Sequence, residues 1–175
     1  MTCARTAPSL FRLCAISLDP PLGCHTDATQ KREQAVAIFD LLDNNRFAPI
    51  EHRGGPYRLR LSLVDRRLVM SVTAENGAPV LCHHLSLTSF RRLLMDYRLV
   101  CESYASTEAR LTSDRLEAID MGRRTIHDEA SALLIQRLKL KIEIDRGTAR
   151  RLFTLIHLLV SQQLLGGGHL TRKTD

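Results

Sequence analysis

The sequence predicts an α+β protein in which a small antiparallel sheet packs against three or four helices, with the C-terminal helix at the centre. Three observations predict it: one region alternates apolar and polar residues, several others repeat apolar residues with helical spacing, and one helix is apolar almost all round. The 175 residues are 44% hydrophobic, which suffices for one core. We therefore expect a single globular domain over residues 13–165, a flexible N-terminal extension at residues 1–12 and a flexible glycine-rich tail at residues 166–175.

Short apolar runs bounded by turn residues predict the strands. Residues 13–18 form the first such run, and a proline pair follows it. Residues 57–63 place an apolar side chain at every second position, which is the pattern of a strand with one buried face. Because Asn76-Gly77 is a strong hairpin signal, the stretch from Arg46 to Ser86 is predicted to be an antiparallel meander.

Two helices are predicted where apolar side chains return every three or four residues. The first begins near Asp27 or Thr29, ends near Asn44-Asn45, and is expected to bury Ala35, Ile38, Phe39 and Leu42. The second begins after Thr88 and carries the apolar positions Phe90, Leu93, Leu94, Tyr97, Cys101 and Tyr104. Each helix therefore has one face for the core and one for solvent.

Two further helices complete the chain. One runs from about residue 113 towards residue 141 and contains Gly122, which we expect to let another backbone approach closely. The last helix begins near Asp145 or Thr148 and is apolar almost all round between Leu152 and Val160. This roundness predicts that the last helix is the central element of the fold.

The chain is basic, and its positive charge is carried mainly by arginine. The formal net charge is +6, from 21 Arg and 4 Lys against 19 acidic residues. Such a composition is typical of GC-rich genomes, but arginine is also well suited to bind carboxylates and phosphates. Six arginines lie between Arg46 and Arg67 against two acidic residues, and among them Arg58 and Arg60 occupy the polar face of a predicted strand. This segment is a candidate patch for an acidic protein or a nucleic acid, although it offers no exposed aromatic side chain on which a base could stack.

The sequence lacks the motifs of several functional classes. No apolar run reaches the roughly 20 residues that a membrane span requires. The five cysteines are odd in number and have no Cys-x-x-Cys spacing, so we expect a reduced, cytoplasmic setting. Cys82 and His84 alternate with His83 on a predicted strand and no second cluster matches them, so we expect no metal site and no cofactor. Cys101 and His157 lie among apolar residues and are expected to be a buried thiol and a hydrogen-bonded core histidine.

The most informative stretch runs from Glu117 to Glu129, because it puts Arg123 near the centre of an apolar stripe. The stripe is formed by Leu116, Ile119, Ile126, Ala130 and Leu133. A guanidinium keeps its charge, so a buried Arg123 requires acidic partners, carbonyl groups, a path to water or a bound anion. Beside it runs a polar stripe whose members lie three or four residues apart: Glu117, Asp120, Arg124, His127 and Ser131.

Three interpretations of this polar stripe remain open. In the first, Asp120 pairs with Arg123 or Arg124 and orders a helix interface. In the second, these arginines bind a phosphate or a partner's carboxylate, with His127 assisting. In the third, His127 is a general acid or base oriented by Asp120 or Asp128.

Arginine pairs at two predicted helix starts are further candidate anion sites. Arg91-Arg92 and Arg150-Arg151 lie in first helical turns, where the helix dipole disfavours cations. Either neighbouring carboxylates compensate these charges, or the arginines join the free N–H groups of the turn in binding an anion.

Several separated motifs keep one order along the chain: Phe47-Ala48-Pro49, Gly54 to Leu59, Leu85 to Thr88, Phe90-Arg91-Arg92, Asp96-Tyr97, Cys101 to Tyr104, Glu117 to Arg124 and Thr148 to Ile156. Together they resemble a small uncharacterised protein family of alphaproteobacteria, UPF0262, over roughly residues 13–159. The resemblance implies a soluble bacterial cytoplasmic protein and brings no activity, cofactor or catalytic residue with it. The chain has Thr125 and Asp128 where the family pattern leads us to expect Gly and Asn, so a role that needs a neutral amide at Asp128 is in doubt.

These patterns favour a non-enzymatic binding or regulatory protein that recognises an acidic partner through arginines. The candidate anion-binding residues are Arg58, Arg60, Arg91, Arg92, Arg123, Arg124, Arg150 and Arg151. The alternative is a small hydrolase or transferase that uses His127 with Asp120. An enzyme of that kind requires these two side chains to converge with Arg123 and Arg124 in a concave pocket.

Overall fold

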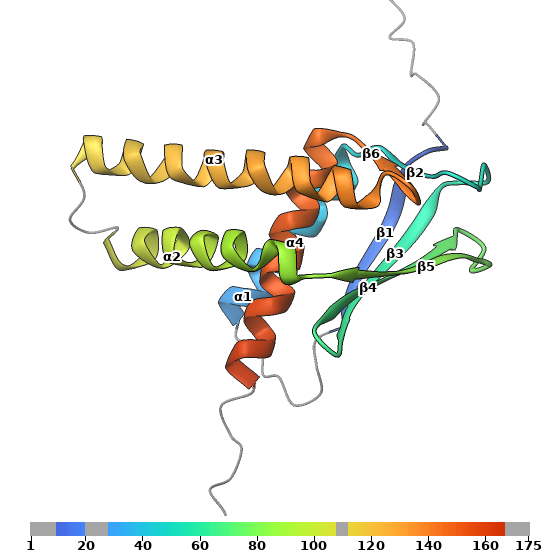
Figure 1. Ribbon diagram of the computed structural model, residues 1–175, viewed down its shortest axis with the longest axis horizontal. Helices are drawn as coiled ribbons and strands as arrows, with labels where there is room; N and C mark the ends of the chain where they lie inside the picture. The colour runs from blue at the N-terminus through green and yellow to red at the C-terminus, as the bar shows by residue number, and fades with distance from the viewer. Residues whose placement is uncertain (1–9, 20–27, 108–111, 167–175) are drawn as a thin grey trace, which may run out of the picture.

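Figure 1 shows the computed structural model, which describes residues 10–19, 28–107 and 112–166. The expected terminal extensions lie largely outside the described residues, as does the helix start expected at Asp27. The described chain is α+β, as predicted, with the helices on one side and the strands on the other. No helix among the described residues combines the length and the apolar character that a membrane span needs.

The main sheet has four strands in the order β1-β3-β4-β5, formed by Leu13–Asp19, Tyr57–Val64, Arg67–Ala74 and Pro79–Ser86. The last three form an antiparallel meander, which starts at Tyr57 and not at Arg46. The sequence predicts an antiparallel sheet, and this prediction is wrong for β1. β1 pairs with β3 in parallel, so the sheet is mixed. A parallel pair requires a long crossover, and α1 (Ala28–Asp43) lies between these two strands in the chain.

A second, two-stranded sheet joins distant parts of the chain. β2 (Phe47–Pro49) pairs antiparallel with β6 (Ile142–Ile144). β6 was not predicted, because three residues are too few for a period-two pattern to be distinguished.

Asn45 fixes the end of α1 to the start of β1. Its side-chain oxygen accepts the backbone N–H of Leu13 (2.6 Å), and its amide group donates to the carbonyl oxygens of Leu13 (3.2 Å) and Leu41 (3.0 Å). Asn45 therefore takes the place of a neighbouring strand at an edge of the sheet.

The remaining helices are α2 (Arg91–Thr107), α3 (Ser113–Leu138) and α4 (Arg146–Gly166), and a short 3₁₀ turn at Thr88–Phe90 precedes α2. Figure 1 shows α2 and α3 side by side, with α4 crossing them and the sheet on the other side of α4. α4 is the centre of the core, as predicted, because six of its apolar side chains are buried: Ala149, Leu152, Phe153, Leu155, Ile156 and Leu159.

Several predictions about burial are wrong, and the exposed Tyr104 (48%) and Leu116 (38%) are among the residues expected on apolar helix faces. The Arg123 side chain is 53% exposed, because the first half of α3 projects beyond α4 and only its second half is buried, at Ala130, Ser131, Leu134 and Leu138. Phe39 is 70% exposed, because Leu41 and not Phe39 faces the core from α1. A Cβ atom added at Gly122 would meet no atom of the described residues within 4 Å, so none of their backbone packs closely there.

Candidate functional site

The polar stripe of α3 forms local ion pairs. The Asp120 carboxylate accepts hydrogen-bonding contacts from Arg123 (2.9 Å) and Arg124 (2.8 Å). His127 lies two helical turns further on, about 10 Å along the axis, so it does not bond to Asp120. The two residues that a hydrolase or transferase would combine are therefore not brought together.

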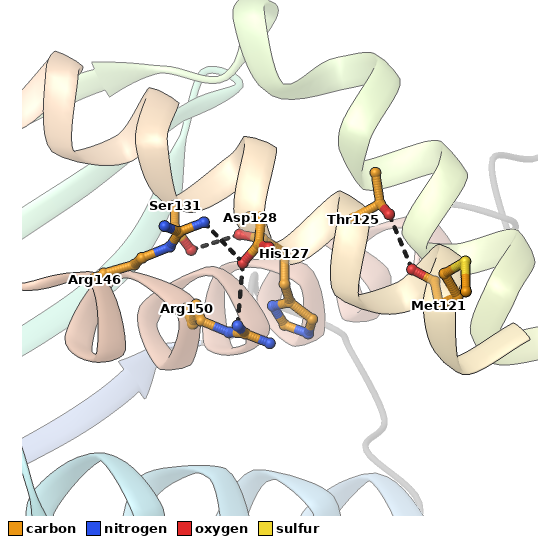
Figure 2. Close-up of polar contacts among 7 residues, drawn as sticks. All are labelled: Met121, Thr125, His127, Asp128, Ser131, Arg146 and Arg150. Atoms are coloured by element: carbon orange, nitrogen blue, oxygen red, sulfur yellow. Dashed lines mark hydrogen bonds and ion pairs between the residues drawn. The ribbon is translucent and has the colours of Figure 1, made fainter. Parts of the chain in front are cut away.

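Asp128 joins α3 to the first turns of α4, as Figure 2 shows. Its Oδ1 atom lies 3.2 Å from Arg146 and 3.1 Å from Arg150. Thr125, the other position at which the chain departs from the expected family pattern, donates to the Met121 carbonyl within its own helix (3.0 Å). Asp128 thus compensates the cations at the start of α4, and its negative charge is part of the helix interface.

Acidic side chains or carbonyl groups also hold several other predicted arginines. Arg92 pairs with Asp96 and Glu129, and Arg60 pairs with Asp19 at 2.9 Å. Arg151 donates to the carbonyl oxygen of Asn44 (3.1 Å). These contacts are internal ion pairs and hydrogen bonds, which is the structural alternative to anion binding.

Tyr97 lies between two histidines in the helical layer. The His127 Nε2 atom is 3.2 Å from the Tyr97 hydroxyl, and both the His127 and His157 rings pack edge-on against the Tyr97 ring, at centroid distances of 4.8 and 4.7 Å. Burial lowers the pKa of both histidines from 6.5 to about 4 and raises the pKa of Tyr97 to about 12. All three rings are therefore neutral at pH 7.

His157 is the buried, hydrogen-bonded histidine that the sequence predicts, whereas Cys101 is only partly buried and not the buried thiol that was expected. His157 is buried and its Nε2 atom lies 3.3 Å from the Ser161 hydroxyl. Burial raises the pKa of the Cys101 thiol, which disfavours the thiolate that a nucleophile needs.

One cavity, the four-helix cleft, lies between all four helices and has a volume of about 550 Å³. Its charged lining consists of three arginines and three carboxylates: Arg32, Arg123, Arg151, Glu33, Asp40 and Asp120. These charges balance, and the Arg123 and Arg151 side chains already have partners. The cleft has no surplus charge with which to attract an anion.

The second cavity, the arginine groove, has a volume of about 600 Å³ and lies between α2, the C-terminal half of α4 and the β3–β4 turn. We define it by its lining: Arg66, Arg91, Arg98, Leu87, Leu94, Met95, Val160, Thr88, His157, Ser161 and Gln163. This lining contains three arginines and no acidic residue. Its single histidine is the buried, neutral His157.

The three arginines reach the groove from two elements. Arg66 lies in the tight β3–β4 turn, in which both Asp65 (φ 48°) and Arg66 (φ 62°) have positive φ. Arg91 is in the first turn of α2 and Arg98 follows two turns later on the same face. Arg98 lies 3.5 Å from Glu102, whereas Arg66 and Arg91 form no ion pair with any described residue.

Sequence reasoning identified Arg91 but missed Arg66 and Arg98 as members of one site. The seven-residue spacing of Arg91 and Arg98 could have indicated a shared helix face. No sequence pattern could have placed Arg66 beside them, because tertiary packing brings the turn to the helices.

The outer face of the main sheet carries the remaining predicted basic residues. Arg58 and Arg60 are exposed and alternate with buried Tyr57, Leu59 and Leu61, as predicted. The Cys82 sulfur and His84 Nε2 lie 3.8 Å apart on β5, but no group of three potential metal ligands occurs among the residues that the structure describes.

Comparison with known proteins places the chain in one family. The model of the uncharacterised protein family UPF0262 matches residues 10–162. The UPF0262 protein of Rhizobium etli (strain CIAT 652) is 55% identical over 149 residues, which cover 85% of this chain and 94% of the relative. The UPF0262 proteins of Agrobacterium fabrum and Brucella canis are each 51% identical over 149 residues, covering 85% of this chain and 94% and 92% of the relatives.

No solved structure matches the chain. The family match nevertheless spans most of the described residues, including the arginine groove except for Gln163. The chain therefore belongs to the UPF0262 family.

Proposed function

We propose that this protein is a non-enzymatic binding protein that recognises an acidic partner through the arginine groove. The observation that carries the proposal is the concentration of three arginines in one concave surface whose lining has no carboxylate. Arginine presents its donors in a planar fork, which suits a carboxylate or a phosphate. An anion in the groove would compensate charges that the described protein leaves largely uncompensated.

The backbone at Arg66 supports the same proposal. Two-residue hairpin turns with positive φ favour Asn-Gly, because only Gly adopts this conformation without steric cost. Arg66 occupies the second position of such a turn, at a cost of about 1 kcal/mol or more. A residue retained in an unfavourable conformation is a reason to look for a functional side chain.

An enzyme built on His127 and Asp120 is the weaker proposal. Asp120 is held by two arginines, and the imidazole of His127 faces Tyr97. A pKa near 4 also makes His127 a poor proton donor or acceptor at neutral pH. We place the binding protein in the cytoplasm, on the basis of its odd number of cysteines.

Anion binding can be tested with three labelled probes: a polyglutamate peptide, inorganic triphosphate and an RNA oligonucleotide. Each is titrated against the full chain at low and at physiological salt, because contacts between charges weaken as salt is added. The variant Arg66→Gln with Arg91→Gln is compared with the control Arg58→Gln with Arg60→Gln, which removes the same charge from the sheet face.

We expect at least one probe to bind the native chain, with a dissociation constant that rises tenfold or more in the groove variant only. A tenfold change corresponds to about 1.4 kcal/mol, which is a modest loss for two charged contacts. Absence of binding at low salt, or an equal loss in the sheet-face control, would refute the proposal.

A further inference from the structure

The arginine groove continues onto exposed apolar surface. Met95 lines the groove and is 54% exposed, and Leu99, one turn further along α2, is 53% exposed. Single exposed apolar residues are common, but Met95 shares the groove lining with Leu94 and Val160, and Leu99 follows it by one helical turn.

The charges and apolar groups of α2 alternate with helical spacing. Arg91, Met95 and Arg98 occupy positions i, i+4 and i+7 of one helix face. The two guanidinium groups are therefore anchored about 10 Å apart along the axis, with an apolar side chain between them. A second helix with acidic residues two turns apart and an apolar residue between them has the complementary pattern.

Other anionic ligands use less of this surface. Inorganic phosphate would contact the arginines and leave Met95 and Leu99 exposed. A single-stranded nucleic acid gains much of its affinity from bases stacked on aromatic rings, and the lining contains no Phe, Tyr or Trp. The combination of separated cations with apolar side chains in the same lining therefore favours a polypeptide.

We infer that the arginine groove binds an acidic amphipathic helix of a partner protein. Carboxylates of that helix contact Arg66, Arg91 and Arg98, and its apolar face lies on Leu94, Met95 and Val160. This inference rests on the proposed function and specifies its ligand.

The test uses a designed peptide of about 20 residues, since shorter isolated helices are marginal in water. The peptide carries leucines every three or four residues on one face and glutamates flanking them, with a fluorescent label for anisotropy. A matched control peptide has every leucine replaced by serine and the same net charge. Both are titrated at physiological salt against the full chain.

Two protein variants separate the apolar contacts of the groove from a general loss of surface hydrophobicity. Met95→Gln with Leu99→Gln, the stripe variant, removes two exposed apolar side chains of α2 at the groove. Met121→Gln with Leu140→Gln, the control variant, removes two exposed apolar side chains outside the groove. We expect the leucine peptide to bind at least tenfold more tightly than the serine peptide. This preference should disappear in the stripe variant and persist in the control variant.

The outcomes distinguish this inference from the proposed function. Equal binding of the two peptides leaves an anion site but overturns the helix. If triphosphate or RNA binds and neither peptide does, an anion site likewise remains and the helix ligand is overturned. If no anionic probe binds, the inference and the proposed function both fail. Self-association of the native chain that the stripe variant abolishes would assign the surface to a second copy and overturn the inference.

Discussion

At the scale of single residues, the arginines divide by what surrounds them. Asp120 holds Arg123 and Arg124 and leaves both side chains largely exposed. Arg66 is different, since it lies without an ion pair among the described residues, at a backbone position that disfavours its side chain. Whether the charge of an arginine is compensated in the folded protein therefore cannot be judged from its neighbours in the sequence alone.

Replacement of Arg66 by glycine is expected to stabilise the protein while weakening anion binding. Glycine removes the steric cost of a positive φ, so the free energy of unfolding should rise by about 1 kcal/mol. The lost guanidinium should raise the dissociation constant of the anionic probe. Urea denaturation measures the first change and fluorescence anisotropy measures the second.

Asp65→Gly is the matched control, because Asp65 shares the turn and its positive φ but does not line the groove. It should stabilise the chain by less than Arg66→Gly, because Asp tolerates a positive φ better than Arg, and it should leave binding intact. A loss of stability in Arg66→Gly would mean that the side chain supports the fold and not a ligand.

Replacement of Arg123 by alanine is expected to change the free energy of unfolding by less than about 1 kcal/mol. Its pair with Asp120 is a solvent-exposed contact three residues apart, and such pairs contribute little. Thermal unfolding of the two proteins in parallel measures the difference. A large fall in the melting temperature would indicate that Arg123 is buried in solution and that the exposed arrangement is wrong.

Arg123 also shows where prediction from sequence stops. The apolar stripe that surrounds it is present, and Ala130 at the far end of that stripe is buried as expected. Whether a stripe is covered depends on the length of the opposing element, which periodicity does not encode. α4 covers only the second half of α3, so the same stripe is core at one end and surface at the other.

At the scale of elements, the long helices could be predicted and the short pairings could not. α1, α2 and α3 each show a 3.6-residue period over several turns, and α4 is apolar almost all round over a helical length, so the existence of these helices follows from local sequence. β6 has three residues, and the parallel pairing of β1 with β3 depends on a crossover that no local motif specifies. The arginine groove belongs to the second kind, since it joins a turn to two helices.

Gly122 gives a prediction for α3. A methyl group there meets no atom within 4 Å, and alanine favours a helix over glycine by about 1 kcal/mol. Gly122→Ala should therefore raise the free energy of unfolding by about 0.5–1 kcal/mol, as measured by urea denaturation.

Gly55→Ala provides a contrast in the opposite direction. An added Cβ at Gly55 would lie 1.8 Å from the carbonyl oxygen of Leu10, so this substitution should destabilise the protein. If Gly122→Ala also destabilised it, another chain or segment would have to contact α3 at that point.

At the scale of the whole molecule, the rings of His127, Tyr97 and His157 connect α3, α2 and α4. The histidines must stay neutral to remain in this cluster, because burial disfavours their charged forms. Protonation of either histidine therefore destabilises the packing of α2, α3 and α4 against one another.

The stability of the protein is expected to fall as the pH is lowered from about 6.5 to about 4. The folded pKa of both histidines, about 4, lies below the ordinary value of 6.5. Their stabilising effect is therefore complete above pH 6.5 and is lost as the unfolded chain takes up protons preferentially. Melting temperatures measured at half-unit pH intervals should show this decline.

His127→Gln should lessen the decline, whereas the control His84→Gln, at an exposed position on β5, should leave it unchanged. Equal pH profiles for the native chain and His127→Gln would show that other groups cause the acid sensitivity. His127 would then be charged or solvated in the folded protein.

Contacts between early and late segments of the chain, such as the pairing of β2 with β6, have a consequence for biosynthesis. The backbone N–H of Arg46 donates to the Thr148 hydroxyl (2.9 Å), 102 residues later, and α1 packs against α4 at the end of the chain. During translation the early segments therefore leave the ribosome long before their partners exist. Closing a loop of this length costs only slightly more entropy than closing a shorter loop. Contacts between residues so far apart in the sequence nevertheless slow folding. Native packing of α1 must wait until α4 has left the ribosome, so the nascent chain exposes apolar side chains such as Leu41 until then.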